Sequence, residues 1–290
     1  MADSCSGLDV GFVHLGYAKV AALGVLQGVT ELLPISSTAH MRIVPALLGW
    51  PDPGAAFSAA MQAAALLAVL SYFRRDIGAI CVGSARALAA GRLGDPDLRL
   101  AGLIVIATIP LGLAGLLLSS RLNACHSALR GLPVIGWACL VMAALLALGE
   151  IFARHRRNVA DTTLLDAVAV GLAQVGALIP GVSRSGSTLT AALALGFRRE
   201  EAARLSFLLG APAIALAGLK EFWELHKAHL SAHGWSLLAV GLAVAAVASF
   251  AAIWGLMCFL ERFSTWPFIA YRALLGVTIL AGVSLGWFAV

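Results

Sequence analysis

Residues 27–40 read QGVTELLPISSTAH and interrupt an apolar region with a proline and a run of polar side chains. Lys19 and Glu31 bracket only eleven uncharged residues, and a second short apolar arm follows the polar run and ends at Trp50. A helix needs about 20 residues to cross the hydrocarbon of a bilayer, so neither arm is long enough to do so. Because Pro34 disfavours a continuous helix, we predict two short helices with a break between them.

A second interruption of the same kind lies in the other half of the chain, where residues 180–188 read PGVSRSGST. The apolar run 167–179 precedes it, and the short arm 189–197 follows it. Irregular backbone at membrane depth persists only where it lines a cavity or is buried in protein. We therefore predict that both interruptions belong to re-entrant helical hairpins rather than to full spans.

The composition is that of an integral membrane protein. Of the 290 residues, 60% are hydrophobic and only 12% are charged, whereas a soluble domain carries about 25% charged residues. The alternative, a soluble protein with a large core, would have too few charges for its surface. Long apolar runs predict six spanning helices, at 55–73, 100–118, 132–149, 205–219, 235–260 and 263–290.

The two interruptions also point to an internal repeat. Gly24 and Gln27 recur as Gly171 and Gln174, and the two glutamines are 147 residues apart, about half the chain. Chance identity in a chain rich in Ala, Leu and Gly is the alternative. The predicted fold class is an all-α integral membrane protein with an inverted-topology internal repeat, a single polytopic domain (1–290) built of two repeats at about 17–152 and 164–290.

Loop charges test this topology. If both interruptions are hairpins, each half has three spans and the halves are inverted. Twelve Lys and Arg residues then fall on one side and five on the other, against eleven and six if the first arms crossed fully. The positive-inside rule makes the richer side cytoplasmic. The cytoplasmic side includes the predicted loop 74–99, whereas Arg130 belongs to the outer side.

Cysteines and net charge support neither a metal cluster nor a nucleic-acid partner. Five scattered cysteines show no CxxC spacing, which indicates neither a disulfide framework nor a zinc site. The net charge of +5 is spread over loops between apolar spans, so it is a topology signal, and we expect no nucleic-acid binding.

Two ionisable residues inside the predicted hairpins, Glu31 and Arg184, are functional candidates. Ionisable groups are costly inside a membrane and usually face a cavity or a partner. The alternative is a buried structural ion pair. Arg184 is a planar, charged fork suited to phosphate oxygens, and nearby glycines and hydroxyls would offer further donors to an anion. This predicted phosphate cradle consists of Gly181, Ser183, Arg184, Ser185, Gly186, Ser187 and Thr188.

The first hairpin supplies reactive groups. Glu31 can bind a divalent cation or act as a base, and His40 can transfer a proton or attack phosphorus itself. Such a set facing a basic cradle suits metal-assisted phosphoryl transfer. The hydroxyl run holds potential nucleophiles, with a helix N-cap as the alternative role, at Ser36, Ser37 and Thr38.

The two interruptions resemble the two signature motifs of bacterial undecaprenyl-diphosphate phosphatases. Further likeness at 57–73, 205–209 and 266–272 extends the resemblance over nearly the whole chain. It implies hydrolysis of undecaprenyl diphosphate to undecaprenyl phosphate and phosphate. That reaction recycles the lipid carrier of peptidoglycan synthesis and is associated with bacitracin resistance.

The resemblance also implies roles and surroundings. By position, the catalytic residues are Glu31, Ser37, His40 and Arg184. It implies a divalent cation, Mg²⁺ or Ca²⁺, with Glu31 as its ligand, a polyprenyl diphosphate lipid as substrate, and homodimers in many members. The location implied is the bacterial plasma membrane, with a site open to the periplasmic side. Gln27, expected to bind substrate, stands where some members carry a second glutamate, which weakens any scheme with two carboxylates on one metal.

A transporter or flippase for a lipid phosphate or an anion is the alternative from another functional class. Inverted repeats with broken helices are a common transporter plan. A carrier needs binding groups but no nucleophile. The combination of Glu31, Ser37 and His40 with Arg184 therefore favours an enzyme.

Overall fold

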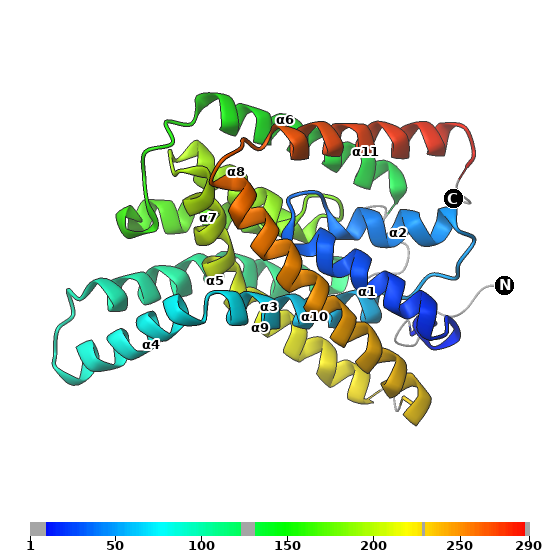
Figure 1. Cartoon of the computed structure of the whole chain (residues 1–290), viewed down its shortest axis with the longest axis horizontal. Helices are drawn as coiled ribbons and strands as arrows, with labels where there is room; N and C mark the ends of the chain where they lie inside the picture. The colour runs from blue at the N-terminus through cyan, green and yellow to red at the C-terminus, as the bar shows by residue number, and fades with distance from the viewer. Residues whose placement is uncertain (1–9, 123–130, 228–229, 288–290) are drawn as a thin grey trace.

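The computed structural model describes residues 10–122, 131–227 and 230–287, and in these ranges the regular elements are helices, with one isolated bridge between Arg157 and Phe197 (Figure 1). This confirms the all-α class. Arg130 lies outside the described residues. In chain order the helices are α1 (Tyr17–Leu32), α2 (Ser37–Leu47), α3 (Ala55–Tyr72), α4 (Arg74–Ala89), α5 (Pro96–Leu122), α6 (Leu132–Phe152), α7 (Leu164–Val175), α8 (Arg184–Ala194), α9 (Arg199–Lys227), α10 (Ala232–Leu260) and α11 (Trp266–Ser284), with short 3-10 turns η1 (Gly11–His14), η3 (Val159–Asp161) and η4 (Gly176–Leu178).

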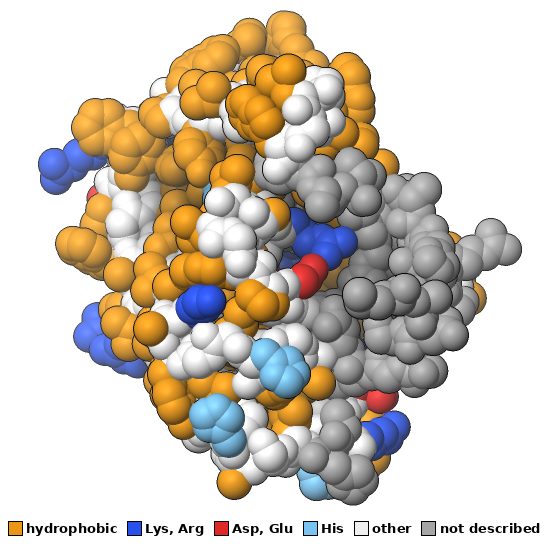
Figure 2. All heavy atoms as spheres, turned by 90° about the vertical axis from the view of Figure 1, so that its right-hand side faces the viewer, with side chains coloured by type: hydrophobic (Ala, Val, Ile, Leu, Met, Phe, Trp, Pro, Cys, Tyr) orange, Lys and Arg blue, Asp and Glu red, His pale blue; other side chains and the backbone are white. Residues whose placement is uncertain are grey.

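The long apolar helices agree with a multi-pass membrane protein. In the described parts of the chain, five helices are long and apolar enough to cross a bilayer: α5, α6, α9, α10 and α11. A sixth span results if α3 and α4, bent by 76° at their junction, are counted together. Each predicted apolar run overlaps one of these helices. Apolar helices also leave hydrophobic side chains on the molecular surface. Figure 2 shows one face on which hydrophobic side chains are common and charged ones are few.

The stretch 74–99 is a correction to the sequence prediction. We predicted a loop there because of its many arginines, but the structure forms α4 and begins α5 within it. α4 packs against α5 and buries Ile80 and Ala87 on one face, so it is an amphipathic helix. Its first turn is held by Asp76, which accepts from Arg204 of α9 at 2.5 Å.

Both predicted interruptions are breaks between two short helices. The first separates α1 from α2, and the second, with η4, separates α7 from α8. Ser36 and Ser183 stand at equivalent points, 147 residues apart, and both have positive φ, 74° and 68°. Each caps the next helix, because its hydroxyl accepts the backbone N–H three residues ahead. The N-cap role predicted for the hydroxyl run is thus confirmed at Ser36.

The first arm of each broken region packs on a helix from the other half of the chain. α1 lies along α10, and α7 lies along α5. A Cβ added to Gly24 would stand 2.7 Å from the Gly241 carbonyl oxygen, and one added to Gly171 would stand 2.6 Å from that of Ala107. Glycine is therefore needed in both arms, because backbone contacts backbone there.

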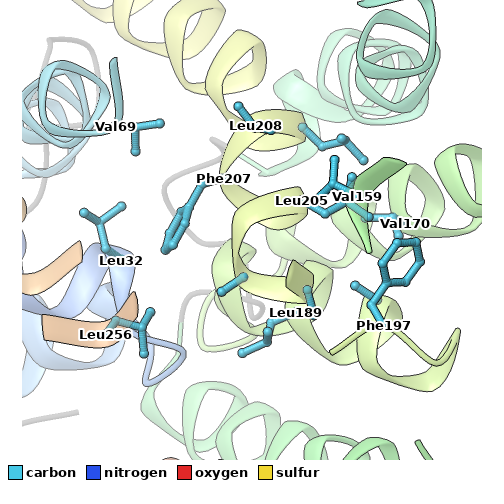
Figure 3. Close-up of a cluster of buried hydrophobic side chains, with 14 of the residues drawn as sticks. Leu32, Val69, Val159, Val170, Leu189, Phe197, Leu205, Phe207, Leu208 and Leu256 are labelled. Atoms are coloured by element: carbon cyan, nitrogen blue, oxygen red, sulfur yellow. The ribbon is translucent and has the colours of Figure 1, made fainter. Parts of the chain in front are cut away.

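Hydrophobic packing buries the ends of both broken regions. The largest buried cluster joins α1, α3, α8, α9 and α10. Figure 3 shows part of this cluster, including the side chains of Leu32, Val69, Leu189, Phe207 and Leu256. Residues 34–36 of the first break and 181–182 of the second are buried in protein, as irregular backbone in an apolar environment requires, whereas Ile179 at the start of the second break is 40% exposed.

The close contact of α1 with α10 predicts the effect of one added methyl group. In Gly28→Ala the new Cβ would lie 2.6 Å from the Ala245 carbonyl oxygen, so the helices must separate. We expect a loss of about 1–3 kcal/mol in the free energy of unfolding, measured by thermal unfolding in detergent.

Gly255→Ala is the matched control, because Gly255 lies on α10 with open space at its Cβ position. We expect it to unfold at the wild-type temperature or above it. Equal midpoint temperatures of thermal unfolding for Gly28→Ala and Gly255→Ala would contradict the tight α1–α10 contact.

Candidate active site

An ion pair joins the two broken regions. Glu31 lies in the last turn of α1, and Arg184 begins α8. Arg184 Nη2 is 3.4 Å from Glu31 Oε1, and their side chains are only 11% and 6% exposed. Both predicted candidates therefore meet in one buried place. A structural ion pair and a reactive site are both consistent with this contact, so the neighbouring groups decide between them.

The other carboxylate oxygen of Glu31 contacts Ser37, one of the predicted candidate nucleophiles. Ser37 Oγ donates to Glu31 Oε2 at 2.7 Å, and Gln27 Nε2 donates to the same oxygen at 3.0 Å. A serine hydroxyl that donates to a carboxylate has its proton acceptor already in place. This arrangement can activate Ser37 for attack, which a purely structural ion pair would not require.

His40 is oriented at both ring nitrogens. Nδ1 lies 2.7 Å from the Ser36 carbonyl oxygen, which can only accept, so we assign the ring proton of neutral His40 to Nδ1. Nε2 then accepts from the Tyr271 hydroxyl at 2.6 Å. The two rings are stacked, with centroids 5.7 Å apart. His40 is buried and Tyr271 is exposed, so this hydrogen bond connects the first break to the surface of α11.

Arg272 is the residue that brings the two breaks together. Its side chain on α11 is completely buried. The guanidinium donates to Pro34 O at 3.1 Å in the first break, and to Gly181 O at 2.7 Å and Val182 O at 2.6 Å in the second. It also reaches Cys139 O of α6 at 3.3 Å. Arg272 and Tyr271 both lie in the stretch 266–272 that carries part of the family likeness, but the sequence alone predicted no role for either.

Three hydroxyls of the predicted phosphate cradle are engaged within the protein, one across the two broken regions and two inside α8. Ser185 Oγ lies 3.2 Å from the carbonyl oxygens of Glu31 and Leu33. Ser187 and Thr188 donate to the Arg184 carbonyl oxygen, at 3.0 and 2.8 Å. Thr38, by contrast, is exposed on α2.

The structure gives the two glycines of the cradle a steric reason beside the predicted one. A Cβ on Gly181 would lie 2.8 Å from the Ile135 carbonyl oxygen of α6, and one on Gly186 would lie 2.6 Å from Arg272 Nη1. Their missing side chains make room for α6 and for the guanidinium. The prediction that they open space for an oxyanion stays untested.

The donor set fits a cation only in part. No group of three or more His, Cys, Asp or Glu side chains that could hold a metal ion occurs in the parts of the chain that the structure describes. Glu31 offers a carboxylate, and Gln27 Oε1 is buried with no hydrogen-bond partner. Mg²⁺ is often held by one or two carboxylates together with substrate phosphates and water. The residues thus fit a cation shared with a phosphate ligand, and not a cage built by protein alone.

Comparison with known proteins covers this whole site. Residues 20–278 match the sequence profile of the family described as Bacitracin resistance protein BacA. Undecaprenyl-diphosphatase 2 of Mesorhizobium japonicum is 68% identical over 264 residues, which are 91% of this chain and 100% of that protein. The undecaprenyl-diphosphatases of Synechococcus sp. (strain RCC307) and Gloeobacter violaceus are 49% and 47% identical, over 91% and 94% of this chain and 92% and 94% of their own.

The hydrogen bonds from Arg272 to both breaks predict a large loss of stability when its guanidinium is removed. In Arg272→Met, the carbonyls that the guanidinium satisfies would stay buried without a donor. Each costs about 1–3 kcal/mol, so we expect the free energy of unfolding to fall by roughly 3 kcal/mol or more.

Arg42→Met is the control, measured by the same thermal unfolding in detergent. Arg42 pairs with Asp52 at 2.5 Å, but both side chains are nearly half exposed, so we expect a change of only about 0–1 kcal/mol. Similar losses in the two variants would refute the special role of Arg272.

Proposed function

The chain belongs to the BacA family of bacitracin resistance proteins, and from this premise we infer that it is an undecaprenyl-diphosphatase. It hydrolyses undecaprenyl diphosphate to undecaprenyl phosphate and inorganic phosphate, which recycles the lipid carrier of cell-wall synthesis. The observation that carries this conclusion is the identity of 68% along the entire length of a relative with that name. The comparisons give the transporter alternative no support.

We propose that Ser37 is the nucleophile. Its hydroxyl donates to Glu31 Oε2 at 2.7 Å, whereas the Nε2 atom of His40 is engaged by Tyr271. Ser37 Oγ would attack the terminal phosphorus as its proton passes to Glu31, and undecaprenyl phosphate would leave with the electrons of the broken P–O bond. Water would then hydrolyse the phosphoserine, releasing phosphate and restoring the hydroxyl.

Arg184 is proposed to stabilise the charge that develops on the transferred phosphoryl group. Its Nη2 faces Glu31, and its Nη1 is buried without a hydrogen-bond partner in the protein. A fixed, desolvated guanidinium is effective at this task because the site does not need to reorganise during the reaction. His40 and Tyr271 would carry protons between the site and the surface.

A divalent cation, Mg²⁺ or Ca²⁺, is proposed to bind between Glu31 and the diphosphate. When bound, it would neutralise part of the negative charge of the phosphates. The oxygen donors of Glu31 and Gln27 support this proposal. A cation shared with substrate also agrees with the lack of a protein cage in the described residues.

The proposed setting is the bacterial plasma membrane, with the site open to the periplasmic side. We propose that both broken regions are re-entrant hairpins and that the two halves are inverted repeats. The equivalent caps at Ser36 and Ser183, and the equivalent glycine contacts of α1 and α7, support the repeat. The family resemblance alone is the ground for proposing a homodimer.

Phosphate release from undecaprenyl diphosphate tests this function. We expect Glu31→Gln, Ser37→Ala and Arg184→Ala each to lower kcat by about 10²–10⁴-fold, and a chelator to suppress the wild-type reaction. Asp52→Asn, at an exposed ion pair, should keep wild-type turnover. Wild-type protein that releases no phosphate with any divalent cation would overturn the assignment.

The hydroxyl of Tyr271 has its own test. Tyr271→Phe removes the donor to His40 Nε2 and interrupts the proposed proton route, so we expect kcat to fall roughly tenfold or more with KM nearly unchanged. Tyr17→Phe is the matched control, because it removes a hydroxyl that bonds Ser236 at 2.7 Å on the surface. Equal kcat values for the two variants would remove Tyr271 from the mechanism.

A further inference from the structure

Gln174 is a buried amide with no hydrogen-bond partner. It lies in the last turn of α7 and is only 1% exposed. Neither its Oε1 nor its Nε2 has a partner in the protein. Leaving such a group unsatisfied is unfavourable, and a native protein rarely tolerates it without a reason. Apolar packing alone would be served better by leucine.

The amide lies beside the free end of Arg184. The position that a Gly210 Cβ would occupy is 3.8 Å from Gln174 Oε1 and in direct contact with Arg184 Nη1. Arg184 Nη1 is itself buried without a partner. The missing side chain at Gly210 thus leaves room for the guanidinium, and two unsatisfied groups from α7 and α8 border the same space.

Comparison with its counterpart shows why the Gln174 amide is free. Gln27 stands 147 residues earlier, and its Nε2 donates to Glu31, four residues ahead. The residue four positions after Gln174 is Leu178, which has no acceptor side chain. The second half therefore keeps the amide but lacks the carboxylate that would occupy it.

The chemistry of this space selects an anion. The amide atom of Gln174 nearest to this space is Oε1, but the amide makes no hydrogen bond, so a half-turn brings Nε2 there without loss and makes it a second donor beside Arg184 Nη1. The positive guanidinium disfavours a cation on that side. Glu31, the nearest carboxylate partner of Arg184, pairs with the other nitrogen, Nη2. A phosphate oxygen accepts from both free donors, which satisfies atoms that the protein leaves unpaired.

We propose that Gln174 is a phosphate-binding residue of the substrate site. Its Nε2 donates to a non-bridging oxygen of the diphosphate beside Arg184 Nη1. This inference rests on the proposed function and adds a residue from the second half of the chain to it. The first broken region then supplies the reacting groups Glu31 and Ser37, and the second supplies the donors that hold the phosphates.

Gln174→Leu separates this role from a structural one. Leucine has a similar volume but no polar atoms, so losing an unpartnered amide should leave the unfolding temperature equal to or above that of the wild type. KM for undecaprenyl diphosphate should rise about tenfold or more, with kcat changed less. The inhibition constant of inorganic pyrophosphate should rise in parallel.

Gln174→Glu is the second variant. A carboxylate there would pair with Arg184 Nη1, which keeps the fold intact while repelling phosphate. We expect an increase in KM larger than that of Gln174→Leu. Unchanged KM in both variants would overturn the proposal, as would a lower unfolding temperature in Gln174→Leu with wild-type KM.

Two controls separate the proposed role of Gln174 from a general effect of losing a buried polar atom and from the proposed function itself. Ser84 Oγ on α4 is another buried polar atom without a partner, so Ser84→Ala makes the same kind of change away from the site, and KM should not move. The wild-type assay provides the other control. If wild-type protein releases no phosphate, the proposed function fails; if it does and Gln174→Leu keeps its KM, only the role of Gln174 fails.

Discussion

The buried guanidinium of Arg272 is the interaction on which the rest of the structure depends. Two helices are broken in an apolar environment, and a break leaves backbone carbonyls that water cannot reach. Arg272 satisfies carbonyls at Pro34 in one break and at Gly181 and Val182 in the other. Arginine suits the task because its donors form a rigid fork, whereas a lysine ammonium is a point charge on a flexible stem. The two breaks must therefore meet.

That meeting creates the site from two incomplete parts. The first region contributes Glu31 and Ser37, already joined by a hydrogen bond, and the second contributes Arg184. In the proposed roles, the nucleophile and its base come from the first region, and the guanidinium that stabilises the phosphoryl group comes from the second. Many of the serines and glycines around them serve this junction, since Ser185 bonds to the first break and Gly186 makes room for Arg272.

Local signals were enough to predict the broken helices, the apolar runs and the cap at Ser36, because each depends on neighbouring residues. α4 was missed because its arginines looked like those of a loop, although its buried face shows that charge and helix coexist there. The contacts of Arg272, and the contact of Tyr271 with His40, could not be predicted, since they join residues 90 or more positions apart through the packing of α11. The family resemblance supplied the substrate, because the residues alone indicated only phosphoryl transfer.

The most direct measurement is an experimental structure of the detergent-solubilised protein with inorganic pyrophosphate bound. We expect the anion between Ser37 and Arg184, with Arg272 still bonded to the carbonyls of both breaks. Pyrophosphate found instead in the cavity of about 430 Å³ lined by α4, α5 and α9, with the two breaks apart, would contradict it.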